Sequence, residues 1–571
     1  MGVGAVLDIT QTALLTQRAA LEVTGHNIAN AETEGYSRQS VSLSPRQSLP
    51  LGRVLLGTGV QLDQVQRAYN AFASMNIDRK TSTLGDLSAR DEYLGILQSV
   101  FNETEDGGLE NQLSAFWAGW QDVANNPGGT AERLAVVQHA EELVSLIGAR
   151  RDQVVSLESE VKSRVTQEVD SVNDMLSQVA TLNNEIVGME AGGASANDLR
   201  DQRDLLLHKI SESVGVNYFE QPNGQTTVFI AGRLMVDGGN SYELDTDSSG
   251  GQLSITWHGS LPTSEDISSQ IDGGKLGGYL TMLQDTLPGC VTGLDDLASS
   301  LVFEVNSVHS QGVGKTALTS ATMTEIADDP TAAMSAAASG LDFHDRIDDS
   351  GAASLKVHVY DAGGTPLVAG GSTITITAGM TLNQLATAID GVNGLSASVT
   401  NGRLTVSAAA GEGGASFAFS DDSSHVLAAL GINTFFSGHD AGTIAVSATA
   451  DNVTASQVQA DSTFGLGDGR NALAIADLAD SRLSIGGTTQ TFGEAAGELL
   501  GDIGVEAASV GRQKGFQEQM IDQLVARRDS QTGVSLDEEL SNMLKFQHAY
   551  TAAAKLLTVA DDMLKTLVEM R

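Results

Sequence analysis

The sequence of 571 residues is poor in cysteine, in positive charge and in long apolar runs, and each shortage excludes a class of protein. Its single cysteine, Cys290, excludes an internal disulfide and a thiolate cluster for zinc or iron–sulfur. With 32 Lys and Arg against 72 Asp and Glu, the formal charge is −40, which disfavours binding to nucleic acid or anionic membrane. No run approaches the ~18 to 20 apolar residues that span a bilayer, and residues 1–10 lack the basic segment of a signal peptide. We therefore expect no nucleic-acid partner, no membrane insertion and no cleaved signal.

Both ends of the chain carry apolar residues at seven-residue intervals, the spacing that marks one face of a coiled-coil helix. Near the N-terminus these are Leu7, Leu14, Leu21 and Ile28; near the C-terminus they are Leu536, Met543, Tyr550, Leu557 and Leu564, with Phe546, Ala553, Ala560 and Leu567 in the second seam position. Because a lone amphipathic helix gains little stability in water, we predict that the two ends pack on each other and on neighbouring copies. A helical hairpin confined to one chain is the alternative.

The middle of the chain alternates between helical and strand patterns. Heptads over residues 137–189 predict a helix of roughly 80 Å, and Pro288 predicts a kink or break in a later helix. From about Gly312 to Ala460 the composition shifts to Gly, Ala, Ser, Thr and Asp. This segment contains strand patterns such as SLKVHVYD, STITITAG and GRLTVSAA and one helical pattern near TLNQLATAID, which together predict an inserted domain.

These patterns predict an elongated, multidomain α+β protein, and its 41% hydrophobic residues are enough to build several cores. We expect a terminal α-helical coiled-coil core of residues 1–75 plus 530–571. A long helical bundle with small β elements is expected to comprise residues 76–312 plus 460–529. The inserted, mostly β domain is expected to cover residues 313–459.

A search for catalytic, cofactor and metal sites finds only imperfect motifs. GVGKT at 312–316 lacks the first glycine of a phosphate loop, whose place is held by His309, so an ordinary turn is favoured. The calcium-loop lookalike that begins at Asp245 ends in Thr256 where a bidentate glutamate is required. The histidines form no zinc-binding pair on one helix, and Asn306 and His309 are expected to make local hydrogen bonds. We expect no enzyme activity, no cofactor and no metal.

One segment carries a family resemblance. GHNIANAETEGYSRQSV, at 25–41, resembles the N-terminal motif of bacterial flagellar axial proteins, the family of rod, hook and hook-associated proteins. Four further segments resemble its hook-associated members: FWAGWQDVANNP (116–127), ANDLRDQRDLLL (196–207), LGINTFFSG (430–438) and GVSLDEELSNMLKFQHAYTAAAKLL (533–557). Hook and distal rod proteins share the N-terminal motif and stay alternatives, although the heptads at 137–189 speak against them. An insertion that serves as an adhesive or enzymatic surface module is a further alternative.

The resemblance implies a structural protein at the junction between hook and filament that allows the filament to assemble. It implies an inner coiled-coil domain made from both termini and an outward-projecting β domain. The implied partners are copies of the chain, the hook protein, the next hook-associated protein and a cytoplasmic export chaperone on the C-terminal helix, around 536–567. The implied location is extracellular, in the flagellum, after type III export without a cleaved signal peptide.

The same resemblance indicates which residues serve assembly. Besides the heptad residues above, Asn27, Asn30, Tyr36 and Arg38 are predicted to contact an adjacent subunit, and the alternative is that they cap the first helix within one chain. The usual family motif is TPGYSRQ, whereas this chain has Glu34 in place of the proline, so we expect a looser loop there.

Overall fold

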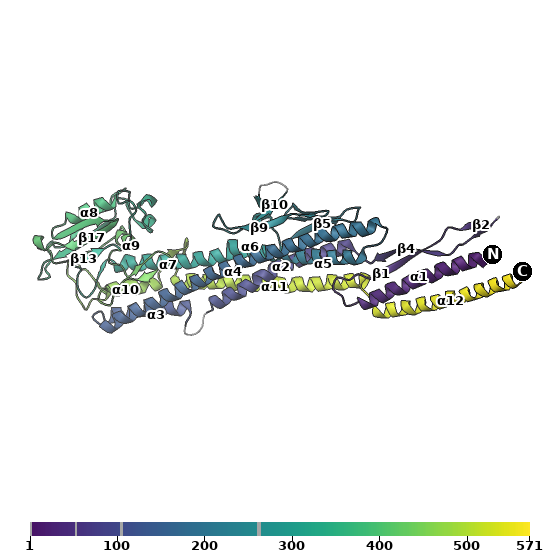
Figure 1. The fold of residues 1–571 in the computed structure, drawn as a ribbon. Helices are drawn as coiled ribbons and strands as arrows, with labels where there is room; N and C mark the ends of the chain where they lie inside the picture. The colour runs from purple at the N-terminus through teal and green to yellow at the C-terminus, as the bar shows by residue number, and fades with distance from the viewer. Residues whose placement is uncertain (1–2, 52–53, 103–106, 260–263, 571) are drawn as a thin grey trace. The chain divides into compact units, whose positions relative to one another are not determined.

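The computed structural model describes residues 3–51, 54–102, 107–259 and 264–570. The fold is α+β, as predicted, with long helices and many small antiparallel sheets (Figure 1). The chain forms two compact units: unit 1 comprises Met1–Tyr93, Glu160–Leu283 and Ala507–Arg571, and unit 2 comprises Leu94–Ser159 and Gln284–Glu506. The division into three domains stays a prediction.

The α-helices follow the apolar periodicity of the sequence. Their bounds are α1 (Val3–Ala29), α2 (Ala71–Val100), α3 (Leu109–Asn125), α4 (Thr130–Ala191), α5 (Asn197–Ser213), α6 (Gly274–Thr281), α7 (Leu287–His309), α8 (Leu382–Asp390), α9 (Val426–Leu430), α10 (Arg470–Ala476), α11 (Phe492–Thr532) and α12 (Leu536–Glu569). The predicted helix over 137–189 is confirmed as α4, which buries its valine seam. Arg151 interrupts that seam, and its guanidinium Nε lies 3.1 Å from Asp295 Oδ1 of α7. Pro288 lies in the first turn of α7, directly after a π-helical segment (Met282–Thr286) that joins α6 to α7 without a gap. The helix thus changes type beside Pro288 but does not break, and a kink stays a prediction.

The sheets of unit 1 are small and antiparallel. They are the pairs β1 (Gln39–Pro45) with β4 (Val60–Arg67) and β2 (Leu49–Leu51) with β3 (Val54–Leu56), the four-stranded sheet β5 (Val216–Glu220), β6 (Thr226–Ile230), β7 (Arg233–Asp237) and β8 (Asn240–Ser241), and the three-stranded sheet β11 (Ser264–Asp266), β10 (Ser254–His258) and β9 (Glu243–Asp247). The calcium-loop lookalike is the β9–β10 hairpin. At its turn the Asp247 carboxylate accepts a hydrogen bond of 2.8 Å from Ser249 N, so this aspartate stabilises a local turn.

The strands of unit 2 include the inserted segment. They are β12 (Gly312–Val313) with β21 (Ser456–Gln457), the sheet β13 (Ser320–Thr322), β17 (Arg403–Ala408) and β16 (Leu395–Thr400), the sheet β15 (Ser372–Thr375), β14 (Ser354–Tyr360) and β18 (Ser416–Ser420), and the pairs β19 (Phe436–Ser437) with β20 (Ala445–Val446) and β22 (Leu483–Ile485) with β23 (Thr488–Gln490). The three quoted strand patterns correspond to β14, β15 and β17, and the quoted helix to α8. Its start is fixed by a capping box between Thr381 and Gln384.

His309 lies in an aromatic core of unit 2, against Trp120 and Phe435. Thr454 N donates to His309 Nε2 (3.2 Å), so the proton sits on Nδ1, which lies 2.8 Å from the backbone oxygen of Asn433. Asn306 likewise donates to the backbone oxygen of Phe436 (3.0 Å). Asn306 and His309 therefore make hydrogen bonds, as predicted, but the expectation that these are local is wrong, because the partners lie more than 120 residues further along the chain.

The buried imidazole predicts acid sensitivity in unit 2. Burial lowers the pKa of His309 to about 4. The unfolded chain binds a proton near the ordinary pKa of ~6.5, whereas the folded chain does not. Stability is therefore expected to fall between about pH 6.5 and pH 4, by on the order of 3 kcal/mol. Urea unfolding across this range measures the slope, and His309→Asn should flatten it; an unchanged slope in that variant would contradict the assignment.

Candidate assembly surface

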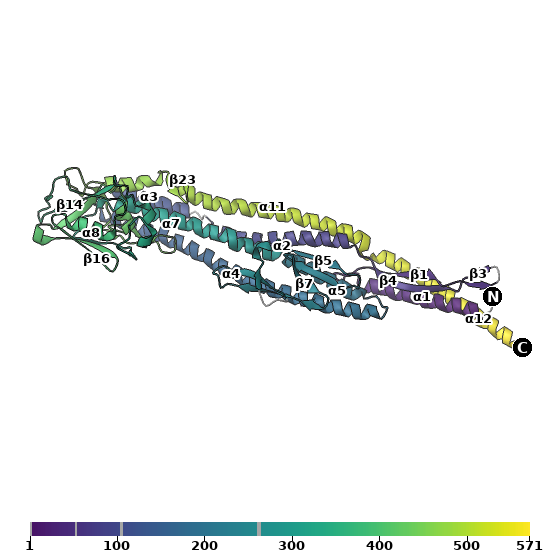
Figure 2. The same ribbon diagram turned by 90° about the horizontal axis from the view of Figure 1, so that it is seen from above.

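The two terminal helices lie side by side in unit 1, as predicted. Helices α1 and α12 are in extensive contact, run antiparallel, and bring the N- and C-terminal ends of the described chain together (Figures 1 and 2). The contact on α12 uses small residues, since Ala553 and Ala560 are buried whereas the large side chains around them are not. Helix α1 also packs on β1 and β4. The pair therefore forms within one chain, and its packing on neighbouring copies stays a prediction.

The predicted seam residues differ in burial. Half-buried are Leu7, Leu14, Leu21, Ile28, Met543 and Phe546; exposed are Leu536, Tyr550, Leu557 and Leu564; the side chain of Leu567 lies outside the described residues. The fully buried side chains of α1 are instead small or polar: Thr10, Thr16, Ala20, Thr24 and Asn27. Within one chain, the helix pair thus leaves much of the predicted apolar seam in solvent.

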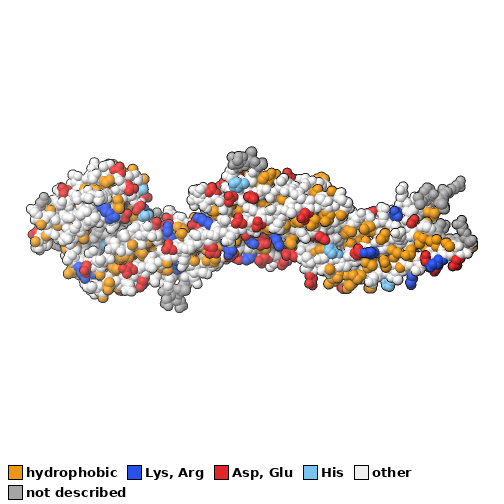
Figure 3. Space-filling view, viewed as in Figure 1, with side chains coloured by type: hydrophobic (Ala, Val, Ile, Leu, Met, Phe, Trp, Pro, Cys, Tyr) orange, Lys and Arg blue, Asp and Glu red, His pale blue; other side chains and the backbone are white. Residues whose placement is uncertain are grey.

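The sequence pattern missed further apolar residues on the flanks of α12. These are Leu540, Leu544, Leu556, Val559 and Met563, all exposed. Figure 3 shows hydrophobic side chains gathered over α1 and α12. These residues could have been found from the sequence, because they place apolar side chains on several sides of the helix. A helix that is apolar on several sides is normally buried on several sides. A single heptad template captures only one of these sides.

The segment NIANAETEGYSRQS closes the end of α1 with hydrogen bonds inside the chain. Asn27 Oδ1 accepts from Tyr36 Oη (2.8 Å) and from Gln39 N (2.9 Å), and Asn27 Nδ2 donates to the Gln39 carbonyl (2.8 Å). Asn30 Nδ2 donates to the carbonyl of His26, one turn earlier (3.1 Å). Glycine suits the tight turn before Tyr36, because Gly35 has a φ of +77°.

Arg38 connects this segment to the start of α12. Its Nε and Nη2 lie 2.9 and 2.8 Å from Glu539 Oε1, and its Nη1 lies 3.4 Å from Glu538. Asn27, Asn30, Tyr36 and Arg38 thus all have hydrogen-bond partners within the chain, and the capping alternative stays open. Their contact with an adjacent subunit stays a prediction, as does a looser loop at the exposed Glu34.

The motif ANDLRDQRDLLL lies on α5 and holds the same segment from the other side. Ser37 N donates to Asp201 Oδ2 (2.9 Å), and Gln39 Nε2 donates to Asp198 Oδ1 (2.7 Å). Arg67, at the end of β4, lies 2.9 Å from Asp201 and 2.6 Å from Asp204. Burial raises the pKa of both aspartates, and the guanidinium of Arg67 opposes that rise. Two motifs that are far apart in sequence therefore form one polar joint.

A cavity of about 680 Å³ lies beside this joint, between loop 31–38 and the linker 533–535 that separates α11 from α12. Asp78, which lines it, already accepts a hydrogen bond from Tyr218 Oη (2.6 Å) and lies 2.8 Å from His208 Nδ1. The carboxylate is thus engaged by its own chain, and we assign no ligand to the cavity.

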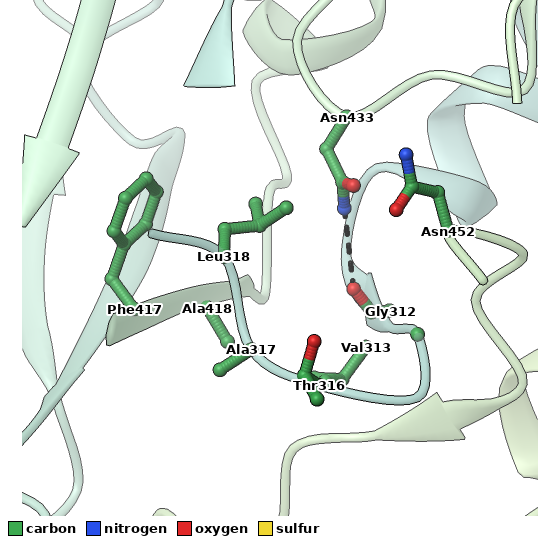
Figure 4. A pocket seen from close by; sticks show the side chains of 10 residues that line it. Gly312, Val313, Thr316, Ala317, Leu318, Phe417, Ala418, Asn433 and Asn452 are labelled. Atoms are coloured by element: carbon green, nitrogen blue, oxygen red, sulfur yellow. Dashed lines mark hydrogen bonds between the residues drawn. The ribbon is translucent and has the colours of Figure 1, made fainter. Parts of the chain in front are cut away.

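The GVGKT segment is a structural turn. Lys315 Nζ lies 2.7 Å from Asp451 Oδ1 and 3.1 Å from Thr130 Oγ1. The adjacent cavity measures about 10 Å³, which is water-sized. Asn433 donates to the carbonyl of Gly312 at its edge (Figure 4). The predicted turn is confirmed.

Over residues 3–51, 54–102, 107–259 and 264–570, no helix combines the length and the hydropathy needed to cross a membrane. Over the same residues, no group of three or more His, Cys, Asp and Glu side chains is arranged to hold a metal ion.

Comparison with known proteins gives matches along most of the chain. Residues 94–322 match the model of the flagellar hook-associated protein FlgK helical domain. The chain is 26% identical to flagellar hook-associated protein 1 of Bacillus subtilis, over 98% of this chain and 97% of the relative. It is 24% identical to flagellar hook-associated protein 1 of Escherichia coli, over 99% of this chain and 100% of the relative. The chain is thus similar to flagellar hook-associated protein 1 along nearly its whole length.

Further matches locate family features on the structure. Residues 7–36 match the flagella basal body rod protein model and residues 528–570 match the C-terminal model of flagellar basal body rod FlgEFG proteins, so the terminal matches include most of α1 and α12. Residues 354–410 match the flagellin hook IN motif, which here forms β14–β17 and α8. The solved structure of the flagellar hook junction protein FlgK from Burkholderia pseudomallei aligns with a TM-score of 0.54 at 18% identity, covering 81% of this chain and 100% of that chain. This likeness supports the fold.

Proposed function

We propose that the chain is a structural component of the bacterial flagellum that forms the junction between hook and filament and allows filament assembly. Similarity over nearly the full length supports this function, because the relatives are flagellar hook-associated proteins. The observation that carries the mechanism is helix α12, whose flanks expose apolar side chains. The chain acts through binding surfaces, and the family is structural, not enzymatic.

The first proposed partner is a copy of the chain. Burial of apolar side chains gains about 25 cal/mol per Å², so the exposed flanks of α12 gain most when another apolar helix covers them. In a closed ring each copy presents one face to the copy before it and a different face to the copy after it, so every interface repeats the same pair of surfaces. At either side of such a ring, the hook protein and the next hook-associated protein are the proposed neighbours.

Export is proposed to follow the route of flagellar axial proteins. We expect passage through the flagellar type III apparatus without a cleaved signal peptide and a final extracellular location in the flagellum. Before assembly, the apolar flanks of α12 have no subunit to cover them, and a cytoplasmic chaperone on this helix is the proposed cover.

Deletion of the gene tests the junction function. Cells without the chain are expected to make hooks but to release filament protein into the medium, because filament subunits then lack the surface on which they assemble. Electron microscopy and assay of the medium measure this, and a plasmid copy of the gene should restore filaments. Normal filaments in the deletion strain would overturn the proposal.

A further inference from the structure

Glu539 is a buried carboxylate at the start of a helix whose other buried residues are alanines. It is 2% exposed, whereas its neighbour Glu538 is exposed. Arg38 donates twice to Glu539 Oε1, and Asn27 Nδ2 donates to Oε2 (3.0 Å). Both oxygens are therefore held by the NIANAETEGYSRQS segment.

Asn27 has no freedom to shift, because each of its polar atoms is engaged. Its Oδ1 accepts from Tyr36 and Gln39, and its Nδ2 donates to Gln39 and Glu539. An amide held in this way requires an acceptor at one point along α12. It thus marks a position on the partner helix.

The apolar part of the contact does not mark a position. Apolar residues repeat by seven on α1 and again on α12, so sliding one helix past the other by a heptad restores similar apolar pairing. The buried Thr10 and Thr16 place their hydroxyls on carbonyls of their own helix, and neither specifies a partner. Ala553 and Ala560 have small apolar side chains, which make no directional contact with α1. Repetition and small side chains together leave the register open.

We propose that Glu539, held by Arg38 and Asn27, sets the register between α1 and α12 and so determines which side chains the terminal pair presents for assembly. A slip by one heptad brings Phe546 beside Arg38 and Asn27. These two polar side chains then face a phenyl group, which has no oxygen or nitrogen atom to accept their hydrogen bonds. A slip in the other direction places the end of α11 where Glu539 now lies and breaks the hydrogen bond that Arg38 N donates to the Thr532 carbonyl (3.3 Å). Glu539 is thus a positioning residue, and the inference rests on the proposed function.

Distance measurement between two spin labels tests the register in the full chain. Arg18→Cys and Gln547→Cys place labels on exposed positions of α1 and α12, in a Cys290→Ala background. With Glu539 in place, the doubly labelled chain is expected to show one narrow distribution of label-to-label distances. Glu539→Ala is expected to add a second population whose axial offset is about 10 Å, the length of one heptad.

Two variants separate register from stability. Glu538→Ala removes the exposed neighbouring carboxylate and is expected to keep the single distance. Glu539→Gln retains an acceptor for Arg38 but turns an NH2 donor toward Asn27 Nδ2, so it is expected to add the second distance as a smaller population than Glu539→Ala does. A single unaltered distance in Glu539→Ala, a broad distribution without a second preferred distance, or a broad distribution in the unaltered chain would each overturn the inference.

The distance is measured in one chain and does not depend on the flagellum. If the deletion strain built normal filaments, the junction function would fail while the register result stood. If Glu539→Ala kept one distance while the deletion strain lost its filaments, only the register inference would fail.

Discussion

An aspartate in place of Leu556 is expected to abolish filament attachment while leaving the stability of the isolated chain nearly unchanged. Leu556 is 56% exposed on the flank of α12, and surface substitutions of this kind change the free energy of unfolding by only about 0.5 kcal/mol. In the proposed ring, the new carboxylate would be removed from water without a partner. This would cost about 3 kcal/mol or more in every copy of the chain. Filaments counted by electron microscopy in the complemented deletion strain, together with urea unfolding, measure both effects.

The matched control is Gln547→Asp, which adds the same charge at an exposed polar position of the same helix. It is expected to support normal filaments. The fate of the Leu556→Asp chain also tests the chaperone proposal: protein released into the medium indicates failed assembly after export, whereas protein retained in the cell indicates failed export. Normal filaments with Leu556→Asp, or equal loss with Gln547→Asp, would contradict the assembly surface.

Removal of Arg67 is expected to destabilise unit 1 strongly. Its guanidinium is almost fully buried between Asp201 and Asp204, so Arg67→Ala leaves two carboxylates without their counter-charge. Breaking a buried pair in this way costs about 3 to 5 kcal/mol. Urea unfolding measures the loss. Hydrogen exchange is expected to increase first in β1, β4 and the start of α5, which the joint connects.

The control for this loss is Arg18→Ala, which removes an ion pair with Glu22 whose side chains are both exposed. Such a pair contributes about 0.5 kcal/mol or less. Since Asp201 and Asp204 already have raised pKa values, the Arg67→Ala chain should protonate them more readily and recover part of its stability on mild acidification. A loss as small as that of Arg18→Ala would show that the joint carries little energy.

The local elements of the fold could be predicted from sequence because they depend on short-range periodicity. The seven-residue repeats at both ends specify α1 and α12, and the valine seam specifies α4. Alternation specifies β14 and β17, and Pro288 marks the change from π-helix to α-helix because its ring removes a backbone donor. The motif beginning at Gly25 likewise indicated the resemblance to flagellar axial proteins before any contact was known.

By itself, then, the sequence determined the long helices, several strands and the resemblance to flagellar proteins, because these depend on residue type and spacing. It did not indicate β1 to β4, which lie within the segment 1–75 that was predicted as a helical core. Only the tertiary structure decided that Asn27 meets Glu539, 512 residues away, and that Arg67 bridges two aspartates of α5. The partner of a polar side chain depends on how distant segments pack, which no local pattern encodes. The same holds for the flanks of α12, since an apolar residue is recognisable in sequence, but whether its own chain covers it is a property of the folded molecule.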